Sequence, residues 1–309
     1  MHIVTLVAAD RGRRCLEKIL ALKAPEDRLD VFTFKETPWE PPFSQSILDL
    51  SHRTGSPASV TTKVHQASFQ HIWDARPDII FVVGWRYMIP ASVYESAKVG
   101  CFVFHDSMLP KYRGFSPSVW SMRNGEASTG ATLFEIAEGV DEGRIVCQRE
   151  VPFTNEDEIS SVTEKVTRVY LEILEAIWPQ LPDGLTLREQ DHSVASYTSK
   201  LIPEDFYLDF NTHSTATLHN YVRSYSRPYP GAFTRLNGDK LTIWKARIQE
   251  TPTYVGSIPG RPVSINSDGS VTVATSDGLL RIETVSVNDG APLSANQVIN
   301  KLGFTLGRN

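Results

Sequence analysis

The sequence predicts an α/β protein in which a mostly parallel sheet is followed by a smaller β-barrel domain. In the first 110 residues, short apolar runs alternate with amphipathic stretches, as expected when strands and helices take turns along a parallel sheet. After about residue 200 the pattern changes to brief β-like runs separated by Gly, Pro, Asn and Asp, which is typical of a small barrel. A chain of 309 residues has room for both domains.

The spacing of apolar residues predicts the strands and helices of the first domain. Strands are predicted over residues 3–9, 29–34, 58–62, 78–84 and 101–104. Helices are predicted over 14–22 and 44–53, and three prolines make 35–43 an irregular loop. The last two strands are apolar on both faces, as expected of central strands covered by helices. Ligands of such sheets bind beyond the carboxyl ends of the strands, so we expect functional residues after Gly84 and Phe104.

The later elements divide the chain into two domains. Apolar residues at helical spacing predict a long helix over 155–178. Residues 181–200 lack a clear period and are expected to be a linker between a first domain, 1–180, and a second, 201–309. The second domain begins with a short predicted helix over 215–225. Its predicted strands are 240–248, 261–265, 270–274 and 278–285.

Composition excludes several classes of protein. The 41% of hydrophobic and 22% of charged residues are typical of a globular chain, and no apolar run approaches the roughly 20 residues of a membrane span. No basic residues precede the first apolar run, as they would in a secretory signal, so we expect a cytoplasmic protein. Cys15, Cys101 and Cys147 are too widely spaced for a disulfide framework or a zinc site, and no metal is expected.

The distribution of charge argues against a protein dedicated to nucleic acid. The net charge is −5, and residues 201–309 contain ten Lys and Arg against nine Asp and Glu, a balance of only +1. A surface that follows a phosphate backbone needs a marked excess of basic residues. The sequence therefore makes a nucleic-acid partner improbable without excluding tRNA.

The residues best suited to chemistry follow the last strand of the first domain. His105 stands in a polar turn, and Pro110 and Gly114 restrict the loop behind it. An imidazole at such a place is either a proton acceptor or a hydrogen-bonded structural residue, and the pattern leaves both open. About 36 residues later, Asp141 supplies a carboxylate between two glycines. No Walker A, G-x-G-x-x-G or G-x-S-x-G motif follows a strand, so neither a nucleotide-phosphate loop nor a hydrolase nucleophile is indicated.

Motifs spread over both domains carry a family resemblance. Those of the first domain are His105-x-Ser107-x-Leu109-Pro110-x-Tyr112-Arg113-Gly114, Thr129-Gly130-Ala131-Thr132-Leu133 and Asp141-x-Gly143-x-Ile145, and those of the second are residues 197–201, 208–210, 227–233 and 241–244. Together they resemble the formyltransferase family that uses 10-formyltetrahydrofolate, which includes methionyl-tRNA and nucleotide-sugar formyltransferases. Residues 13–17 and 31–34 resemble the sugar branch, in particular the 4-amino-4-deoxyarabinose enzymes.

The resemblance implies a fold and a reaction. It implies a Rossmann-like formyltransferase domain over residues 1–180 and a small open β-barrel over 201–309. The implied reaction moves a formyl group from 10-formyltetrahydrofolate to the primary amine of a small molecule, a nucleotide-linked amino sugar. His105 would accept the proton of the amine, and Asp141 would orient the imidazole.

The resemblance also implies binding residues. Backbone groups of two loops would line the slot for the pterin ring of the folate: Met88, Ile89, Pro90, Gly139, Val140 and Asp141. Ser107 and Arg113 would contact the acceptor, although an arginine that holds its own loop explains Arg113 equally well. The resemblance is compatible with a homodimer. It implies no association with a membrane.

Three alternatives stay open. A methionyl-tRNA formyltransferase has this length and barrel, but it would be expected to carry a basic surface. A folate-binding homologue with altered or lost catalysis is the second, because the family pattern has Asn two residues before the histidine and this sequence has Val103. That Asn is expected to donate a hydrogen bond to the formyl oxygen, a contribution worth about 10²–10³ in rate. A different acyl or carbamoyl donor is the third.

Overall fold

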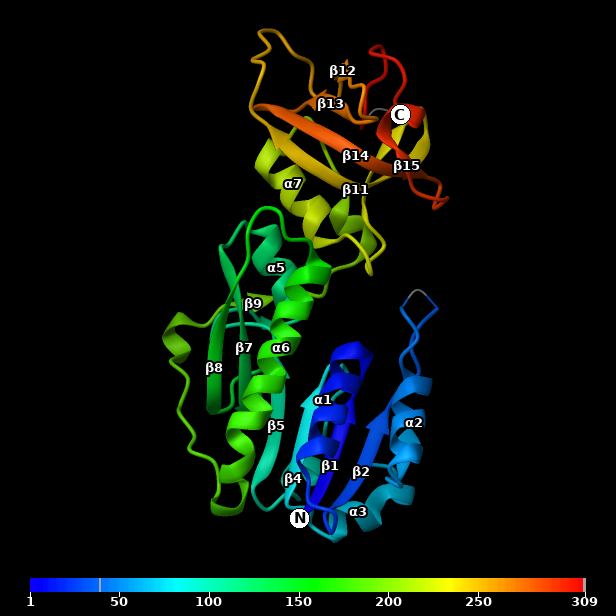
Figure 1. Ribbon diagram of the computed structural model, residues 1–309. Helices are drawn as coiled ribbons and strands as arrows, with labels where there is room; N and C mark the ends of the chain where they lie inside the picture. The colour runs from blue at the N-terminus through cyan, green and yellow to red at the C-terminus, as the bar shows by residue number, and fades with distance from the viewer. Residues whose placement is uncertain (39, 308–309) are drawn as a thin grey trace. The chain divides into compact units, whose positions relative to one another are not determined.

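The first part of the fold is a seven-stranded sheet in the order β3-β2-β1-β4-β5-β7-β8 (Figure 1). The computed structural model describes residues 1–38 and 40–307. The strands are β1 His2–Val7, β2 Arg28–Thr33, β3 Ala58–Val60, β4 Ile79–Val83, β5 Gly100–His105, β7 Ser128–Glu135 and β8 Ile145–Pro152. Strands β1 to β5 run parallel and β7 runs antiparallel to β5. The mostly parallel α/β sheet expected from the sequence is thus present, with its switch point between β1 and β4.

Helices cover both faces of this sheet. The helices α1 (Ala9–Leu22) and α6 (Ile159–Ile177) lie against one face, in front of the strands in Figure 1. On that face the ring of Phe104 lies 4.4 Å, between centroids, from the ring of Tyr170 in α6. Side chains alternate along a strand, so His105 belongs to the opposite face. The remaining helices of the sheet region are α2 (Ser44–Arg53), α3 (Gln70–Asp74) and α4 (Ala91–Tyr94).

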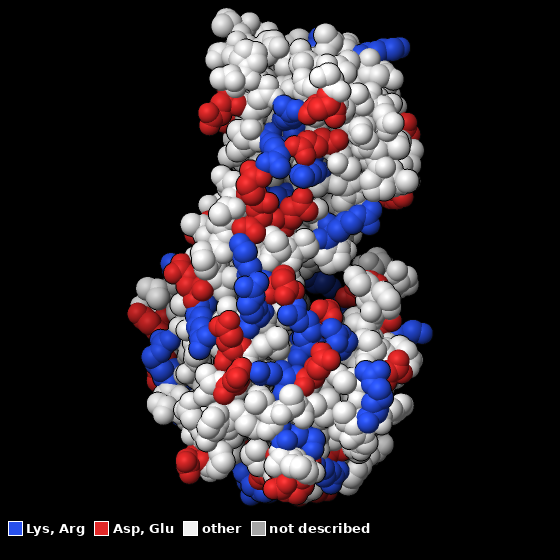
Figure 2. Space-filling view, in the orientation of Figure 1, with Lys and Arg blue, Asp and Glu red and all other residues white. Residues whose placement is uncertain are grey.

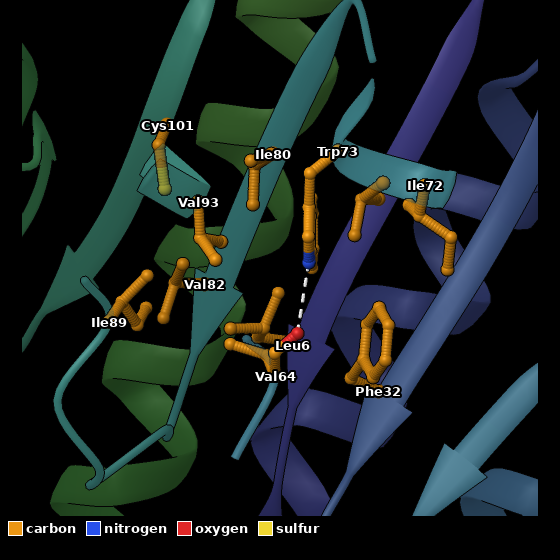
Figure 3. Packing of buried hydrophobic residues seen from close by; sticks show 11 residues of the cluster. Leu6, Phe32, Val64, Ile72, Trp73, Ile80, Val82, Ile89, Val93 and Cys101 are labelled. Atoms are coloured by element: carbon orange, nitrogen blue, oxygen red, sulfur yellow. Dashed lines mark hydrogen bonds between the residues drawn. The ribbon is translucent and has the colours of Figure 1, made fainter. Parts of the chain in front are cut away.

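The core of the opposite face is built around Trp73 of α3 (Figure 3). Its ring stacks on Phe32 of β2 at 5.6 Å between centroids, and its Nε1 donates to the Val64 carbonyl oxygen at 2.9 Å. A buried indole with its N–H satisfied adds a large apolar contact without leaving a polar group unpaired. Ile80 and Val82 of β4 pack in the same cluster, which therefore supports the strands that lead to the carboxyl edge.

The second part of the fold is an antiparallel sheet in the order β10-β11-β14-β13-β12, with β15 paired to β14. Its strands are β10 Ala232–Leu236, β11 Asp239–Gln249, β12 Pro262–Ile265, β13 Val271–Ala274, β14 Leu279–Val287 and β15 Leu293–Ser294. Helix α7 (Thr215–Ser224) packs against β11 and β14, and α8 (Ala295–Val298) against β14. The strands β10 and β12 stand at opposite ends of the order, so the sheet is open, as expected.

The chain divides into two compact units, and each unit is made of three separate segments of the chain. The first unit contains Met1–Pro117, Thr129–Val151 and Thr163–Ser199, and the second contains Ser118–Ser128, Pro152–Val162 and the chain from Lys200 onward. Residues 181–200, expected as a linker, make specific contacts in the first unit: Arg188 bridges to Ile145, and β9 (Tyr197–Thr198) pairs with β6 (Arg113–Gly114). No helix among residues 1–38 and 40–307 is long and apolar enough to span a membrane.

Candidate active site

The carboxyl edge of the sheet holds the histidine that the sequence singled out. His105 is the last residue of β5 and is only 8% exposed. Val103 lies two residues earlier on the same face, beside Val82 of β4 and Phe134 of β7 in the strand register. The switch point lies between β1 and β4, and β5 is the next strand after β4. Ligands of open α/β sheets bind at the carboxyl edge near such a switch point.

The imidazole of His105 has a defined partner on each nitrogen. Its Nε2 lies 2.8 Å from the carbonyl oxygen of Tyr112, and its Nδ1 lies 3.5 Å from Oδ2 of Asp141. A carbonyl oxygen only accepts hydrogen bonds, so Nε2 carries a hydrogen in this arrangement. The nitrogen that can take up or release a proton is then Nδ1, and it faces a carboxylate. The structure thus brings together the two residues predicted as a proton acceptor and its orienting partner.

The position of Asp141 depends on a backbone amide. Gly114 N–H donates to Oδ2 of Asp141 at 2.7 Å, and Asp141 itself has a φ of +50°. Gly114 has a φ of +104°, and a Cβ at this position would lie 2.6 Å from the carbonyl oxygen of Thr198 in β9. The close approach of these two chain segments therefore requires glycine.

Gln190, which was not predicted from the sequence, joins the loops that carry the pair. Its Nε2 donates to the carbonyl oxygens of Asp141 at 2.8 Å and Gly143 at 2.6 Å, while its Oε1 accepts from Nη2 of Arg113 at 2.7 Å. The residue is 4% exposed. No signal in a single sequence marks it, since it stands in the polar stretch Glu189-Gln190-Asp191 of an aperiodic segment.

The two residues predicted to contact the acceptor are both buried. Arg113 is fully buried, and besides Gln190 its guanidinium donates to the Tyr197 hydroxyl at 3.0 Å. These contacts favour the alternative in which Arg113 holds its own loop. The hydroxyl of Ser107 donates to the Lys111 carbonyl oxygen at 2.6 Å, within the same loop. A contact of either residue with substrate stays a prediction.

The two loops predicted to line the pterin slot expose apolar side chains. Met88 is 86% and Val140 59% exposed, whereas Ile89 is buried in the core below. Pro90 precedes α4, and the Gly139 amide donates to Oε1 of Glu142 at 2.9 Å. Nearby in sequence, Nε1 of Trp85 is buried and finds no hydrogen-bond partner among the described residues. Exposed apolar side chains such as Met88 and Val140 suit contact with a flat ring.

Asp106 turns to the face opposite His105. Its carboxylate accepts from the Arg11 guanidinium of α1 and from the Tyr170 hydroxyl of α6. Burial alone would raise the pKa of Asp106, but the adjacent Arg11 holds it below its usual range. Burial and the Asp106 charge together raise the pKa of Tyr170 well above its usual value. Asp106 is therefore an ionised anchor between the site loop and two helices.

The described residues contain no group of three His, Cys, Asp or Glu side chains placed to hold a metal ion. The pair His105 and Asp141 can exchange a proton, with Nδ1 of the imidazole as the exchanging atom. Such a pair can accept a proton from a group bound at the carboxyl edge and stabilise the resulting positive charge.

Comparison with known proteins places this geometry in context. A family model described as formyl transferase matches residues 24–176, and one described as formyl transferase, C-terminal domain, matches residues 200–303. HypX from Aquifex aeolicus in complex with tetrahydrofolic acid is similar at 19% identity and a TM-score of 0.64, over 97% of this chain and 47% of HypX. The chain thus spans about half the length of HypX.

Two shorter proteins match over most of their own length. WlaRD, a sugar 3N-formyl transferase crystallised in the presence of dTDP and 5-N-formyl-THF, is 18% identical with a TM-score of 0.68, over 94% of this chain and 99% of WlaRD. Methionyl-tRNA formyltransferase from Clostridium thermocellum is 15% identical with a TM-score of 0.58, over 81% of this chain and 94% of that protein. At such identities the likeness shows a shared fold.

Proposed function

Because the chain belongs to the formyl transferase family, we propose that it moves a formyl group from 10-formyltetrahydrofolate to the primary amine of a nucleotide-linked amino sugar. The observation that carries the proposal is the pairing of Nδ1 of His105 with Asp141 at the carboxyl edge of the sheet. The same edge carries the two loops with exposed Met88 and Val140, which we assign to the folate.

The proposed role of the pair follows from the chemistry of amide formation. An amine attacks a carbonyl carbon only as the neutral base, and the nitrogen must lose a proton once the new bond has formed. Nδ1 of His105 takes that proton, since Nε2 is bound to the Tyr112 carbonyl oxygen. Asp141 stabilises the cationic imidazole, and the amide of Gly114 keeps its carboxylate in place. Bound 10-formyltetrahydrofolate would supply the formyl carbon and leave as tetrahydrofolate, because the bond from that carbon to N10 breaks and N10 receives a proton, which the His105 imidazolium can return.

The small acceptor is favoured by the distribution of charge. On the face drawn in Figure 2, Lys and Arg lie among Asp and Glu, without a field of one sign. Ion pairs such as Arg14 with Glu164 and Lys18 with Glu175 account for part of this pattern. An enzyme that binds the phosphate backbone of a tRNA needs an excess of Lys and Arg on the binding surface. WlaRD, which acts on a sugar, supports the same choice of acceptor.

A second candidate function is folate binding with altered catalysis, and Val103 favours it. Its side chain packs against the cluster of Leu109, Phe134 and Ile145 and against the core around Trp73. The side chain of Val103 is apolar and partly buried, and it can donate no hydrogen bond to a formyl oxygen. Transfer would then need another donor or would be slow.

The test is transfer of labelled formyl from 10-formyltetrahydrofolate across a panel of nucleotide-linked amino sugars, simple amines and initiator methionyl-tRNA. We expect product with one sugar, and affinity for it that changes little between about 50 and 200 mM salt. Binding of the folate without any product would favour the second candidate. Tight binding of tRNA that weakens about 10³-fold over that salt range would refute the sugar assignment.

A further inference from the structure

The second unit contains a hollow that none of the residues of the His105 site touches. It has a volume of about 660 Å³, within the range of small-molecule sites. We call it the α5–α7 hollow, because its wall is formed by α5 (Pro117–Arg123) with the turn behind it, by α7, and by Asn155. The side chains that matter for binding are Trp120, Arg123, His219, Asn220 and Tyr221.

Arg123 lines this hollow, and one nitrogen of its guanidinium is unpaired among the described residues. Its guanidinium carbon lies 3.9 Å from the centroid of the Tyr221 ring, 5.2 Å from that of Trp120 and 5.0 Å from that of Phe206. Its Nη2 donates to the Tyr221 hydroxyl at 2.8 Å, whereas its Nη1 is buried and has no hydrogen-bond partner among the described residues. Stacked rings fix the guanidinium plane but cannot accept an N–H in that plane.

His219 adds a second unpaired nitrogen in the same wall. The residue is 6% exposed, and its Nδ1 has no hydrogen-bond partner within the described residues. Burial lowers the pKa of His219 to about 4, to which Arg223 and Arg247 also contribute, against an opposing effect of Glu156. The imidazole is therefore neutral at pH 7, with one N–H and one lone pair.

The remaining lining of the hollow is neutral. It consists of amide, hydroxyl, aliphatic and aromatic side chains, and no Asp or Glu occurs among the described residues that form it. Arg123 is partly buried, but its Nη1 is buried without an acceptor, and a buried donor without a partner costs stability that an approaching anion would recover. We propose that the α5–α7 hollow binds a small molecule through an anionic group, a phosphate or a carboxylate, which accepts a hydrogen bond from Nη1 of Arg123.

A neighbouring hollow in the same unit lacks this character. It shares Asn155 and His219 with the α5–α7 hollow, and its charged lining residues are Glu156, Glu158, Arg223, Lys245 and Arg247. Glu156 is already paired with Arg247, and Arg223 donates to the Thr154 carbonyl oxygen at 3.0 Å. Lys245 and Arg247 also pair with Glu283, so this hollow combines basic with acidic side chains. The anion site is therefore assigned to the α5–α7 hollow, and because His219 borders both hollows, the Arg123 variant distinguishes them.

The experiment follows the ring signals of the eight histidines by NMR in the full chain. His219 is identified from the spectrum of His219→Asn, and the probes are inorganic phosphate in one series and benzoate in the other, each at constant ionic strength. We expect a saturable shift of the His219 signal with at least one probe, and an upward move of its pKa when the anion is bound, because nearby negative charge favours the imidazolium. The series that saturates identifies the anionic group.

Three variants test whether Arg123 carries the effect. Arg123→Gln should weaken binding about 10-fold or more, since a charge-assisted hydrogen bond is lost. Arg281→Gln, which alters an arginine of β14 that pairs with Asp268 outside the hollow, should leave binding unchanged. If Arg123→Gln does not fold, Ala216→Trp fills the hollow from an exposed position of α7 and should abolish the shift. No shift of His219 with either probe, or equal binding by the variant with a blocked or uncharged hollow, would overturn the proposal.

Discussion

Replacing Val103 by asparagine restores the donor that the formyltransferase pattern places two residues before the histidine. Val103 and His105 share one face of β5, so an amide at 103 would project beside the imidazole. The surroundings of Val103 are apolar, with Val82 and Phe134 as its neighbours across the strands. Val103→Asn should therefore raise the rate of formyl transfer and lower the free energy of unfolding. The magnitude of each change can be estimated from the surroundings of Val103.

The catalytic gain is bounded by the value of one donor to a developing oxyanion, about 3 kcal/mol or 10²–10³ in rate. A site adapted to valine will realise only part of it, so we expect formyl transfer to rise about 10-fold or more. Val103 is only partly buried, so the cost is at most that of a buried amide with unpaired hydrogen-bonding groups, about 1–3 kcal/mol. At roughly 2–4 °C for each kcal/mol, Tm should fall by no more than about 12 °C.

Both quantities are measured on the same preparation, by single-turnover formyl transfer and by thermal unfolding. Val103→Leu is the matched control, because leucine has nearly the size and shape of asparagine without its donor. The control should change Tm but not raise the rate. A Val103→Asn protein that stays folded and transfers formyl no faster than the parent would refute the reasoning, and would mean that another group already holds the formyl oxygen.

The other predictions concern the pair, the residue that joins its loops and the buried anchor. His105→Asn and Asp141→Asn should each lower turnover by at least about 10² while folate affinity is retained; parental turnover in either would contradict the proton-transfer role. Gln190→Leu should lower the free energy of unfolding by about 2–4 kcal/mol, because two carbonyl oxygens and a guanidinium lose their partner, and denaturant unfolding measures it. Arg11 holds the pKa of Asp106 below the usual value near 3.9. The ionised Asp106 therefore stabilises the folded protein above about pH 4, and this stabilisation is lost as the pH falls further. Asp106→Asn should thus flatten the acid limb of the stability curve, and an unchanged limb would show that the ion pair is not stabilising.

Hydrophobic period was sufficient for most of the first sheet. The helix predicted over 44–53 coincides with α2, and the strands predicted over 78–84 and 101–104 coincide with β4 and β5 within one or two residues. These elements are buried on one or both faces, so their apolar spacing is fixed by packing. The placement of His105 at a strand end follows from the same spacing.

The parts of the site that escaped prediction depend on contacts between distant segments. Gln190 reaches Asp141 across 49 positions of sequence and Arg113 across 77. Aperiodic polar residues look alike whether they are solvated or bind buried backbone, so residues 181–200 could only be predicted as a linker. Asp106 is similar: its role depends on Arg11 and Tyr170, which lie on two helices far from it in the chain.

The late position of Gln190 bears on how the protein is synthesised and dissected. The ribosome synthesises His105 and Asp141 before Gln190 and before β9, the strand that pairs with Arg113 and Gly114. The nascent chain therefore contains both members of the proposed proton-transfer pair before the contacts of Gln190 can form. A fragment that ends at residue 180 would contain the whole sheet but would lack Gln190 and β9, whereas a fragment that ends after Ser199 contains the whole first unit.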